Sequence, residues 1–254
     1  MGISLGKVWF ILRKVLKWKA YRPHLATILS HDQRQRRVQA AEWFLQHDAE
    51  FFQDQVVWSD EKYFMLKQGP NRSIHRYWAP VNPHEFIECK SQSQQKAMCW
   101  TGLFRGKVIG PFWIEGSMDQ HVYHDLLVEK IWPCLKGVAT RHQVYFMQDG
   151  ATCHTTKLNL DFLQKKFNGR LISNKTETPW PPNSPDLNPL DFFFWGYTMN
   201  HVFRVKPNSM EDLKSVVNDF AHAMDPDLVK KVCRSARSRF EKMRTQRGGH
   251  FEQL

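Results

Sequence analysis

The chain has 254 residues, of which 42% are hydrophobic and 13% aromatic, so it can fill one large core and is not a disordered protein. Its formal net charge of +11 favours a polyanionic partner, with nucleic acid ahead of an acidic membrane. The five cysteines lack Cys-x-x-Cys spacing, which argues against a disulfide framework or a zinc knuckle. No apolar run approaches the ~20 residues of a membrane span, so we expect a soluble intracellular protein.

Basic side chains are concentrated at the beginning of the chain. Residues 4–17 predict a short amphipathic helix with Ser4 as its N-cap, and residues 17–24 a basic, aromatic arm suited to a phosphate backbone. A second helix is predicted from about residue 32 to residue 52. We therefore expect residues 1–55 to be a helical DNA-binding segment with a linker helix. Its candidate DNA contacts are Lys7, Arg13, Lys14, Lys17, Lys19, Arg22, Arg34, Arg36 and Arg37.

From residue 56 onwards the pattern changes to strands. Residues 56–66, 96–104 and 108–114 are rich in β-branched and aromatic side chains. A turn is predicted at residues 68–71, and the Arg-Gly-Lys sequence at 105–107 is typical of a hairpin. These residues predict three strands that follow one another in the chain and pair as neighbours.

Helices and short strands alternate after the third strand. Ser117 and Gln120 have capping-box spacing at the start of a helix, which Pro133 should end or kink. Three strands followed by alternating helices and strands predict an α/β fold, with a mixed five-stranded sheet flanked by helices. This order resembles that of ribonuclease H-like domains, which we expect over residues 56–254. The remaining predicted elements are a strand over 142–149, a helix over 158–167, a strand over 170–173, and helices over 210–224 and 228–244.

A proline-rich segment at residues 180–191 leads into a strongly aromatic helix. Its prolines fix their own φ angles and hold the preceding residues in extended conformations, so the segment should be stiff. Asn188 is the predicted N-cap, Pro189 the first helical residue, and Asp191 lies in the first turn. The helix dipole alone could explain an acid at that position. Alternatively, the stiff segment aims the Asp191 carboxylate at a fixed point.

Two further acids lie in predicted strands. Asp60 is in the middle of the first strand and Asp149 ends the fourth, although acids at such places also serve turns or salt bridges. In the predicted sheet these strands are neighbours, so the two carboxylates would be about one strand spacing, ~5 Å, apart. Two acids this close repel unless a cation lies between them, and few oxygen ligands suit Mg²⁺ or Mn²⁺. Asp191 would be the third ligand.

Three motifs containing these acids resemble those of mariner-like transposases of the DDE/D type. The resemblance extends to residues 22–25 and 32–37, which are similar to the family's linker, and to its C-terminal signature at 248–252. It implies that Asp60, Asp149 and Asp191 bind two Mg²⁺ or Mn²⁺ ions and catalyse DNA cleavage and strand transfer. It also implies double-stranded DNA partners (transposon ends and target), a homodimer and a nuclear location. The motifs are Trp58-Ser-Asp-Glu61, Gln148-Asp-Gly-Ala151 with His154, and the proline-rich segment 180–191.

Two departures from the family pattern leave other hypotheses open. The 41 residues between Asp149 and Asp191 (191 − 149 − 1) exceed the usual spacing. Residues 4–17 match only the last recognition helix of the family's paired helix-turn-helix region, so the chain is expected to be a truncated member. A transposase-derived protein that binds DNA without cutting it is the alternative. A nuclease acting on RNA–DNA hybrids is a third hypothesis.

Three neighbours of the candidate ligands have simpler interpretations. Asp186 competes with Asp191 for a metal role but is expected to cap a turn. Glu61 should point to the sheet face opposite Asp60 and be solvated. His154 is expected to be a structural histidine, although its closeness to Asp149 would also suit a contact with a substrate phosphate.

Overall fold

The computed structural model divides into two compact units, one up to Ile28 and the other over Leu29–Glu252. The predicted turn at 68–71 and the linker residues 22–25 lie outside the described residues. The residues that the structure describes are 4–17, 28–66, 95–139 and 143–251.

The first unit contains the predicted basic helix. Helix α1 (Leu5–Phe10) continues as the π-helical turn η1 (Ile11–Val15). Ser4 caps it, because its Oγ accepts a hydrogen bond from the Lys7 N–H at 3.4 Å. Most apolar side chains described in this helix are also exposed, with Val15 at 61%. Helix formation and capping are thus as predicted.

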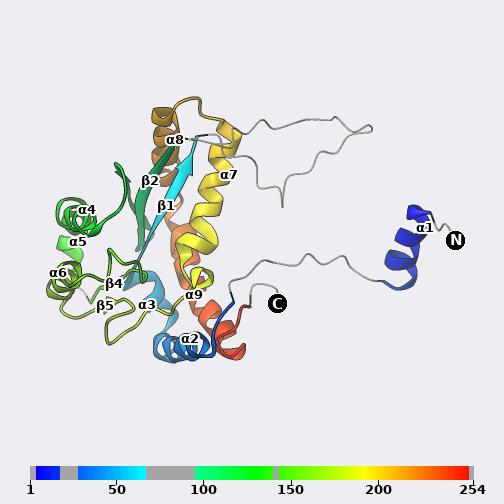
Figure 1. Ribbon diagram of the computed structural model, residues 1–254, viewed down its shortest axis with the longest axis horizontal. Helices are drawn as coiled ribbons and strands as arrows, with labels where there is room; N and C mark the ends of the chain where they lie inside the picture. The colour runs from blue at the N-terminus through cyan, green and yellow to red at the C-terminus, as the bar shows by residue number, and fades with distance from the viewer. Residues whose placement is uncertain (1–3, 18–27, 67–94, 140–142, 252–254) are drawn as a thin grey trace. The chain divides into compact units, whose positions relative to one another are not determined.

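The second unit is built on a mixed sheet of five strands in the order β3-β2-β1-β4-β5 (Figure 1). The first three strands along the chain pair antiparallel, and the last two extend the sheet in parallel beyond β1. This confirms the predicted ribonuclease H-like order. The strands are β1 (Val56–Met65), β2 (Lys96–Phe104), β3 (Lys107–Ile114), β4 (Tyr145–Met147) and β5 (Leu171–Ile172).

The predicted hairpin joins β2 to β3. Its two turn residues, Arg105 and Gly106, have φ angles of 50° and 76°, in the left-handed region. Glycine adopts such angles without steric cost, and a turn of this hand matches the twist of the flanking strands. The local sequence therefore determines this connection.

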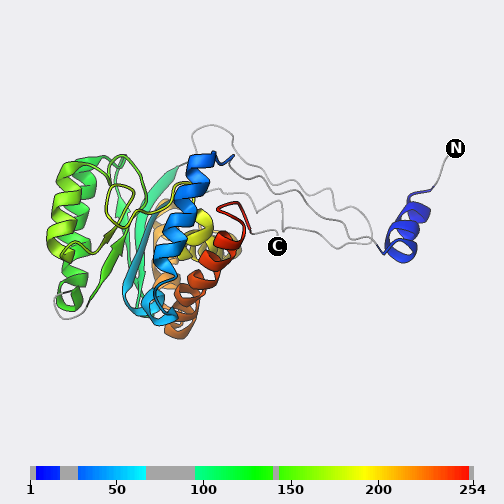
Figure 2. The same ribbon diagram turned by 90° about the horizontal axis from the view of Figure 1, so that it is seen from below.

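Helices cover both faces of the sheet (Figure 2). One face is covered by α4 (Gln120–Leu126), the π-helical turn η2 (Leu127–Ile131), α5 (Trp132–Ala139) and α6 (Lys157–Phe167). The other is covered by α2 (His31–Phe44), α3 (Ala49–Asp54), α7 (Trp195–Val205), α8 (Met210–His222) and α9 (Pro226–Thr245).

Alternation along β1 divides its side chains between two cores. Trp58 and Phe64 belong to the core under α9, whereas Val57 belongs to the core under α4 to α6. Side chains at successive strand positions point to opposite faces, so Asp60 lies on the α9 side and Glu61 on the α4 side. The two adjacent acids thus have different surroundings.

The predicted linker helix belongs to the larger unit. Instead of one helix it forms two, α2 and α3. The second has its own N-cap, Asp48, which accepts a hydrogen bond from the Phe51 N–H at 2.8 Å. Phe44 of α2 stacks on Phe240 of α9, with ring centroids 4.2 Å apart. The expected boundary between residues 55 and 56 therefore differs from the division after Ile28 in the structure.

The helix before Pro133 starts and continues differently from the prediction. Its N-cap is Asp119, whose Oδ1 accepts from the His121 and Val122 N–H groups, so the predicted cap, Ser117, lies outside the helix. In η2 the Trp132 N–H bonds to Leu127 O, five residues back. This wider turn precedes Pro133, and the chain remains helical to Ala139.

None of the described helices combines the length and the apolar character needed to cross a membrane. In the same described residues, Cys99, Cys134, Cys153 and Cys233 are free thiols.

Candidate active site

Asp60 is the centre of the candidate site. The indole N–H of Trp195 on α7 donates to its Oδ2 at 2.6 Å. Burial, and then the negative charges of Asp191 and Glu61, raise the pKa of the Asp60 carboxyl well above its usual range, and the Trp195 hydrogen bond offsets only part of this. An ionised Asp60 is therefore unfavourable here without a cation.

The proline-rich segment fixes Asp191 beside β1. The segment includes the 3₁₀ turn η3 (Pro185–Leu187), and the helix begins with the π-helical turn η4 (Leu190–Phe194). Asn188 caps this helix, because its Oδ1 accepts from the Leu190 N–H at 3.2 Å. Its Nδ2 donates to Ser59 O at 3.2 Å. The predicted cap therefore also ties the helix start to the residue before Asp60, and leaves Asp191 exposed in the first turn.

Asp149 follows β4 next to β1. The parallel register pairs Val56 with Tyr145 and Val57 with Phe146, and Asp149 comes two residues after the last residue of β4, Met147. Ser59 Oγ also donates to Met147 O at 2.6 Å across the two strands. The predicted neighbourhood of the first and fourth strands is confirmed.

Hydrogen bonds hold one oxygen of Asp149. Its Oδ1 accepts from the Ala151 N–H at 2.9 Å and lies 2.7 Å from His154 Nδ1. Burial alone would raise the pKa of the Asp149 carboxyl, but the hydrogen bond and charge of His154, together with the Ala151 N–H, lower it below its ordinary value. Asp149 is thus favoured as a carboxylate.

The donor set suits a hard divalent cation. Asp60 and Asp191 interact electrostatically, and Asp149 follows β4, the strand that pairs with β1. In the described part of the chain, no three His, Cys, Asp or Glu side chains are already arranged as a metal site. The fit rests on Asp60, a half-buried carboxylate whose charge is opposed by two other acids and would be relieved by Mg²⁺ or Mn²⁺.

Asp186 and Arg37 have a structural role together. The Arg37 guanidinium donates to both Asp186 oxygens, at 3.1 Å and 2.6 Å, and to Ser184 Oγ at 2.6 Å. It also donates to the carbonyl oxygens of Asn183 and Gly248. The prediction that Arg37 contacts DNA is wrong, because its side chain is buried and its donors are bound by protein. Both oxygens of Asp186 are likewise occupied.

The other predicted DNA contacts lie at the surface where they are described. Lys7, Arg13, Lys14 and Lys17 are exposed in or beside α1 and η1. Arg34 and Arg36 are exposed on α2, with Arg36 Nε 3.0 Å from Asp32 Oδ2. Lys19 and Arg22 lie outside the described residues.

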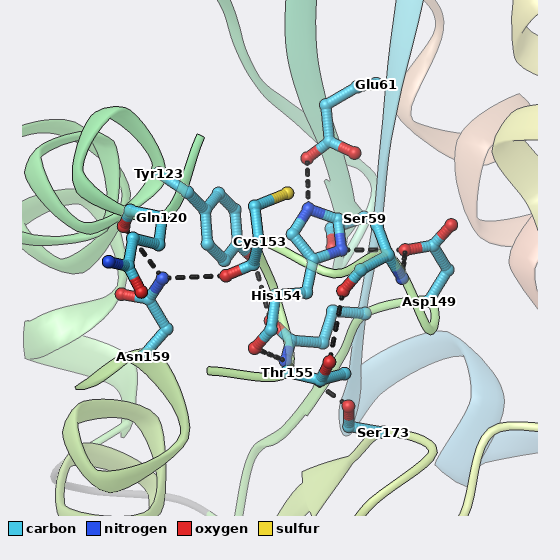
Figure 3. Close-up of polar contacts among 12 residues, drawn as sticks. Ser59, Glu61, Gln120, Tyr123, Asp149, Cys153, His154, Thr155, Asn159 and Ser173 are labelled. Carbon is cyan, nitrogen blue, oxygen red and sulfur yellow. Dashed lines mark hydrogen bonds and ion pairs between the residues drawn. The ribbon is translucent and has the colours of Figure 1, made fainter. Parts of the chain in front are cut away.

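A buried polar network lies behind Asp149 (Figure 3). His154 Nε2 is 3.3 Å from Glu61 Oε1, and both side chains are largely buried, so the expectation that Glu61 is solvated is wrong. Glu61 does point away from Asp60, but α4 and α6 cover that face. Burial alone would lower the pKa of His154, whereas the charge of Glu61 and the hydrogen bond with Asp149 help to raise it well above its usual value. The imidazole therefore sits between two carboxylates.

Sequence reasoning missed two partners in the site. Trp195 belongs to an aromatic cluster that is most simply core, yet it also binds Asp60. The indole N–H was the available signal, since a buried tryptophan needs an acceptor. Glu61 carried a similar signal, because a layer of helices was predicted on each face of the sheet and would cover it.

Comparisons with known proteins agree with these observations. No protein-family model matches the chain. Over 226 residues it is 26% identical to the Tc3 transposase of Caenorhabditis elegans, covering 87% of this chain and 64% of that protein. Over 178 residues it is 29% identical to the Tcb1 transposase of Caenorhabditis briggsae, covering 67% and 60%. The chain spans about three-fifths of the length of these relatives.

Solved structures share the fold. The Mos1 transposase paired-end complex with the left transposon end matches with a TM-score of 0.80 at 21% identity, over 98% of this chain and 72% of that one. The catalytic domain of Mos1 mariner transposase matches with a TM-score of 0.68 at 20% identity, over 90% of this chain and 100% of that one. The chain therefore has the ribonuclease H-like fold of these structures, and its sequence is similar to transposases of the Tc1/mariner type.

Proposed function

We propose that this protein is a transposase that cleaves DNA strands and joins them to other DNA, with Asp60, Asp149 and Asp191 as the ligands of two divalent metal ions. The observation that carries the proposal is the position of Asp60, a half-buried carboxylate whose ionisation is opposed by desolvation and by Asp191. Such an arrangement favours cation binding over a purely structural acid.

Each proposed ligand is held by a different element. Trp195 fixes Oδ2 of Asp60, Asn188 fixes the helix start that carries Asp191, and His154 and Ala151 fix Oδ1 of Asp149. When bound, Mg²⁺ or Mn²⁺ supplies positive charge that activates the attacking oxygen and stabilises the leaving one. Mos1 complexes have been solved with Mn and with Mg, which supports this choice.

The proposed substrate is double-stranded DNA, both transposon ends and target. The exposed basic side chains of α1, η1 and α2 would neutralise phosphates. The Mos1 paired-end complex with a transposon end supports the DNA partner, and its paired ends suggest a homodimer, which we propose for this chain too. With this substrate, we also propose that the protein acts in the nucleus.

Plasmid nicking and strand transfer with Mg²⁺ or Mn²⁺ test the proposal. We expect Asp60→Asn, Asp149→Asn and Asp191→Asn each to abolish both reactions while DNA binding persists. Binding without cleavage by the unmodified protein would overturn the proposal in favour of a DNA-binding relative. Cleavage of an RNA–DNA hybrid in preference to duplex DNA would overturn it in favour of a different nuclease. Full activity of Asp191→Asn would remove Asp191 from the site.

A further inference from the structure

His154 links two carboxylates, Glu61 in β1 and Asp149 after the neighbouring strand β4. It follows β4 by a short loop, is 2% exposed, and has Asp149 on one ring nitrogen and Glu61 on the other. Figure 3 shows the ring between these two acids. Asp149 is half-exposed at the candidate site, whereas Glu61 is buried behind it. The imidazole is therefore a fixed connection between the site and the interior.

Contacts of the ring determine which atom of Asp149 remains available. Oδ1 already receives the Ala151 N–H at 2.9 Å and faces His154 Nδ1 at 2.7 Å. These two partners fix the plane of the carboxylate. Oδ2 is the oxygen left to meet a cation, so Asp149 would bind through a single oxygen.

Glu61 holds the other side of the ring. Its Oε1 lies 3.3 Å from His154 Nε2, and in the described residues neither buried atom has a hydrogen bond to another group. Side-chain alternation along β1 points Glu61 away from Asp60 and towards Tyr123. A carboxylate placed there can orient the imidazole but is on the wrong face to share a metal with Asp60.

The surroundings of the ring are equally well defined. Tyr123 packs against it with ring centroids 4.2 Å apart, and the Tyr123 hydroxyl donates to Gln148 Oε1 at 2.8 Å. The Gln148 amide donates in turn to the His154 carbonyl at 3.0 Å and to Ser173 Oγ at 3.3 Å. Both the ring and the backbone of His154 are thus held, which is more than packing alone requires.

We propose that His154 and Glu61 are positioning residues of the active site, in which Glu61 orients the His154 ring and His154 holds Asp149 so that only Oδ2 faces the metal. The inference rests on the proposed function, because it assigns the support of one proposed ligand. Partners of this kind behind a metal ligand typically change metal affinity by about 10–100-fold when they are removed.

Binding of Mn²⁺ alone to the protein, followed by electron paramagnetic resonance, tests the inference without cleavage. We expect His154→Ala to weaken Mn²⁺ binding about 10–100-fold. His154→Asn places an amide near the Nδ1 position and should recover most of the affinity, whereas His154→Gln reaches only towards Glu61 and should resemble His154→Ala. Melting temperatures of all variants identify any that fail to fold. If His154→Ala fails to fold, His154→Asn keeps the test valid.

A double-mutant cycle tests whether Glu61 affects metal binding through His154. Glu61→Ala should weaken Mn²⁺ binding in the unmodified protein but add nothing in the His154→Ala background, because Glu61 acts through His154. Glu61→Gln keeps an acceptor and should be milder. Glu115→Ala and His222→Ala, two exposed positions, are the matched controls and should leave Mn²⁺ binding unchanged.

The outcomes separate this inference from the function on which it rests. If Asp149→Asn leaves Mn²⁺ binding unchanged, the proposed metal site itself is wrong. If Asp149→Asn weakens binding but His154→Ala and Glu61→Ala do not, only the positioning role is wrong. Equal affinities of His154→Asn and His154→Gln, or additive effects of Glu61→Ala and His154→Ala, would also overturn it.

Discussion

Arg37 and Asp186 form a buried, two-pronged ion pair, with Nη2 and Oδ2 2.6 Å apart and side chains that are 0% and 4% exposed. The pair joins α2 to the proline-rich segment, and Arg37 Nε extends the connection to Gly248 O at 2.8 Å. Three stretches distant in sequence are therefore fixed by one guanidinium.

Removing that guanidinium should destabilise the fold severely. Arg37→Ala leaves the Asp186 carboxylate buried without its partner, and we expect the free energy of unfolding to fall by about 3–5 kcal/mol in urea denaturation. Arg36→Ala is the matched control: its pair with Asp32 is exposed, so the loss should stay below about 1 kcal/mol. Equal losses for the two variants would contradict the structural role of Arg37.

Asp60 should make the metal-free protein less stable as the pH rises. Its pKa is raised in the folded state, so the folded state is favoured while the carboxyl is protonated, and this stability is lost as the pH rises through the raised pKa. Asp60→Asn should therefore raise the melting temperature at neutral pH and flatten its fall as the pH rises above the ordinary carboxyl pKa. Thermal melts with a chelator measure this. An unchanged pH profile would refute it.

Asp149 should have the opposite effect on the pH dependence of stability. Its pKa is lowered in the folded state, so its contribution to stability is present above the ordinary carboxyl pKa and is lost as the pH falls through the lowered value. We expect Asp149→Asn to weaken the protein at neutral pH and to reduce its loss of stability on acidification. Denaturant titrations at acidic and neutral pH check both effects, and greater stability of the variant at neutral pH would be the contrary result.

Trp195 should influence the pKa of Asp60, the acid that it contacts. Trp195→Phe keeps an aromatic ring but removes the N–H that donates to Asp60 Oδ2 at 2.6 Å. That bond lowers the pKa of Asp60, so its loss should raise the pKa further. Since a metal binds the carboxylate form, Mn²⁺ binding should then require higher pH. Calorimetric titrations across pH measure the shift. Tyr197→Phe, an exposed position on the same helix, should leave the profile unchanged.

Gly248 should tolerate no side chain. Its φ is +79°, and a Cβ there would lie 2.2 Å from Arg34 O. We expect Gly248→Ala to cost about 1–3 kcal/mol or more in chemical denaturation, since both strain and overlap are introduced. Gly196→Ala is the control, and it should increase stability. A Cβ at this position in α7 would meet nothing within 4 Å, and alanine favours a helix by up to about 1 kcal/mol.

Much of the site could be predicted because its signals are local. The acids in two apolar strands, and Asn188 before Pro189, define their positions without knowledge of distant residues. Arg37 shows where such reasoning needs more care. It lies on the same helical stripe as Ala40, Ala41 and Phe44, at the i, i+3, i+4 and i+7 positions, all of which are buried. Helical periodicity therefore indicated a buried position for Arg37, although the predicted DNA contacts grouped it with Arg34 and Arg36. Its partner, Asp186, comes from a segment 149 residues away.

The stacking of Phe44 on Phe240 has a consequence for synthesis of the protein. During synthesis, α2 emerges from the ribosome before α9. The core under α4 to α6 has all its parts once Leu171 has emerged, because its buried residues come from earlier in the chain. The core under α9 also needs Phe240 and Met243, so it closes only after these residues have been synthesised. The face of the sheet that carries Asp60 is therefore the last to be enclosed.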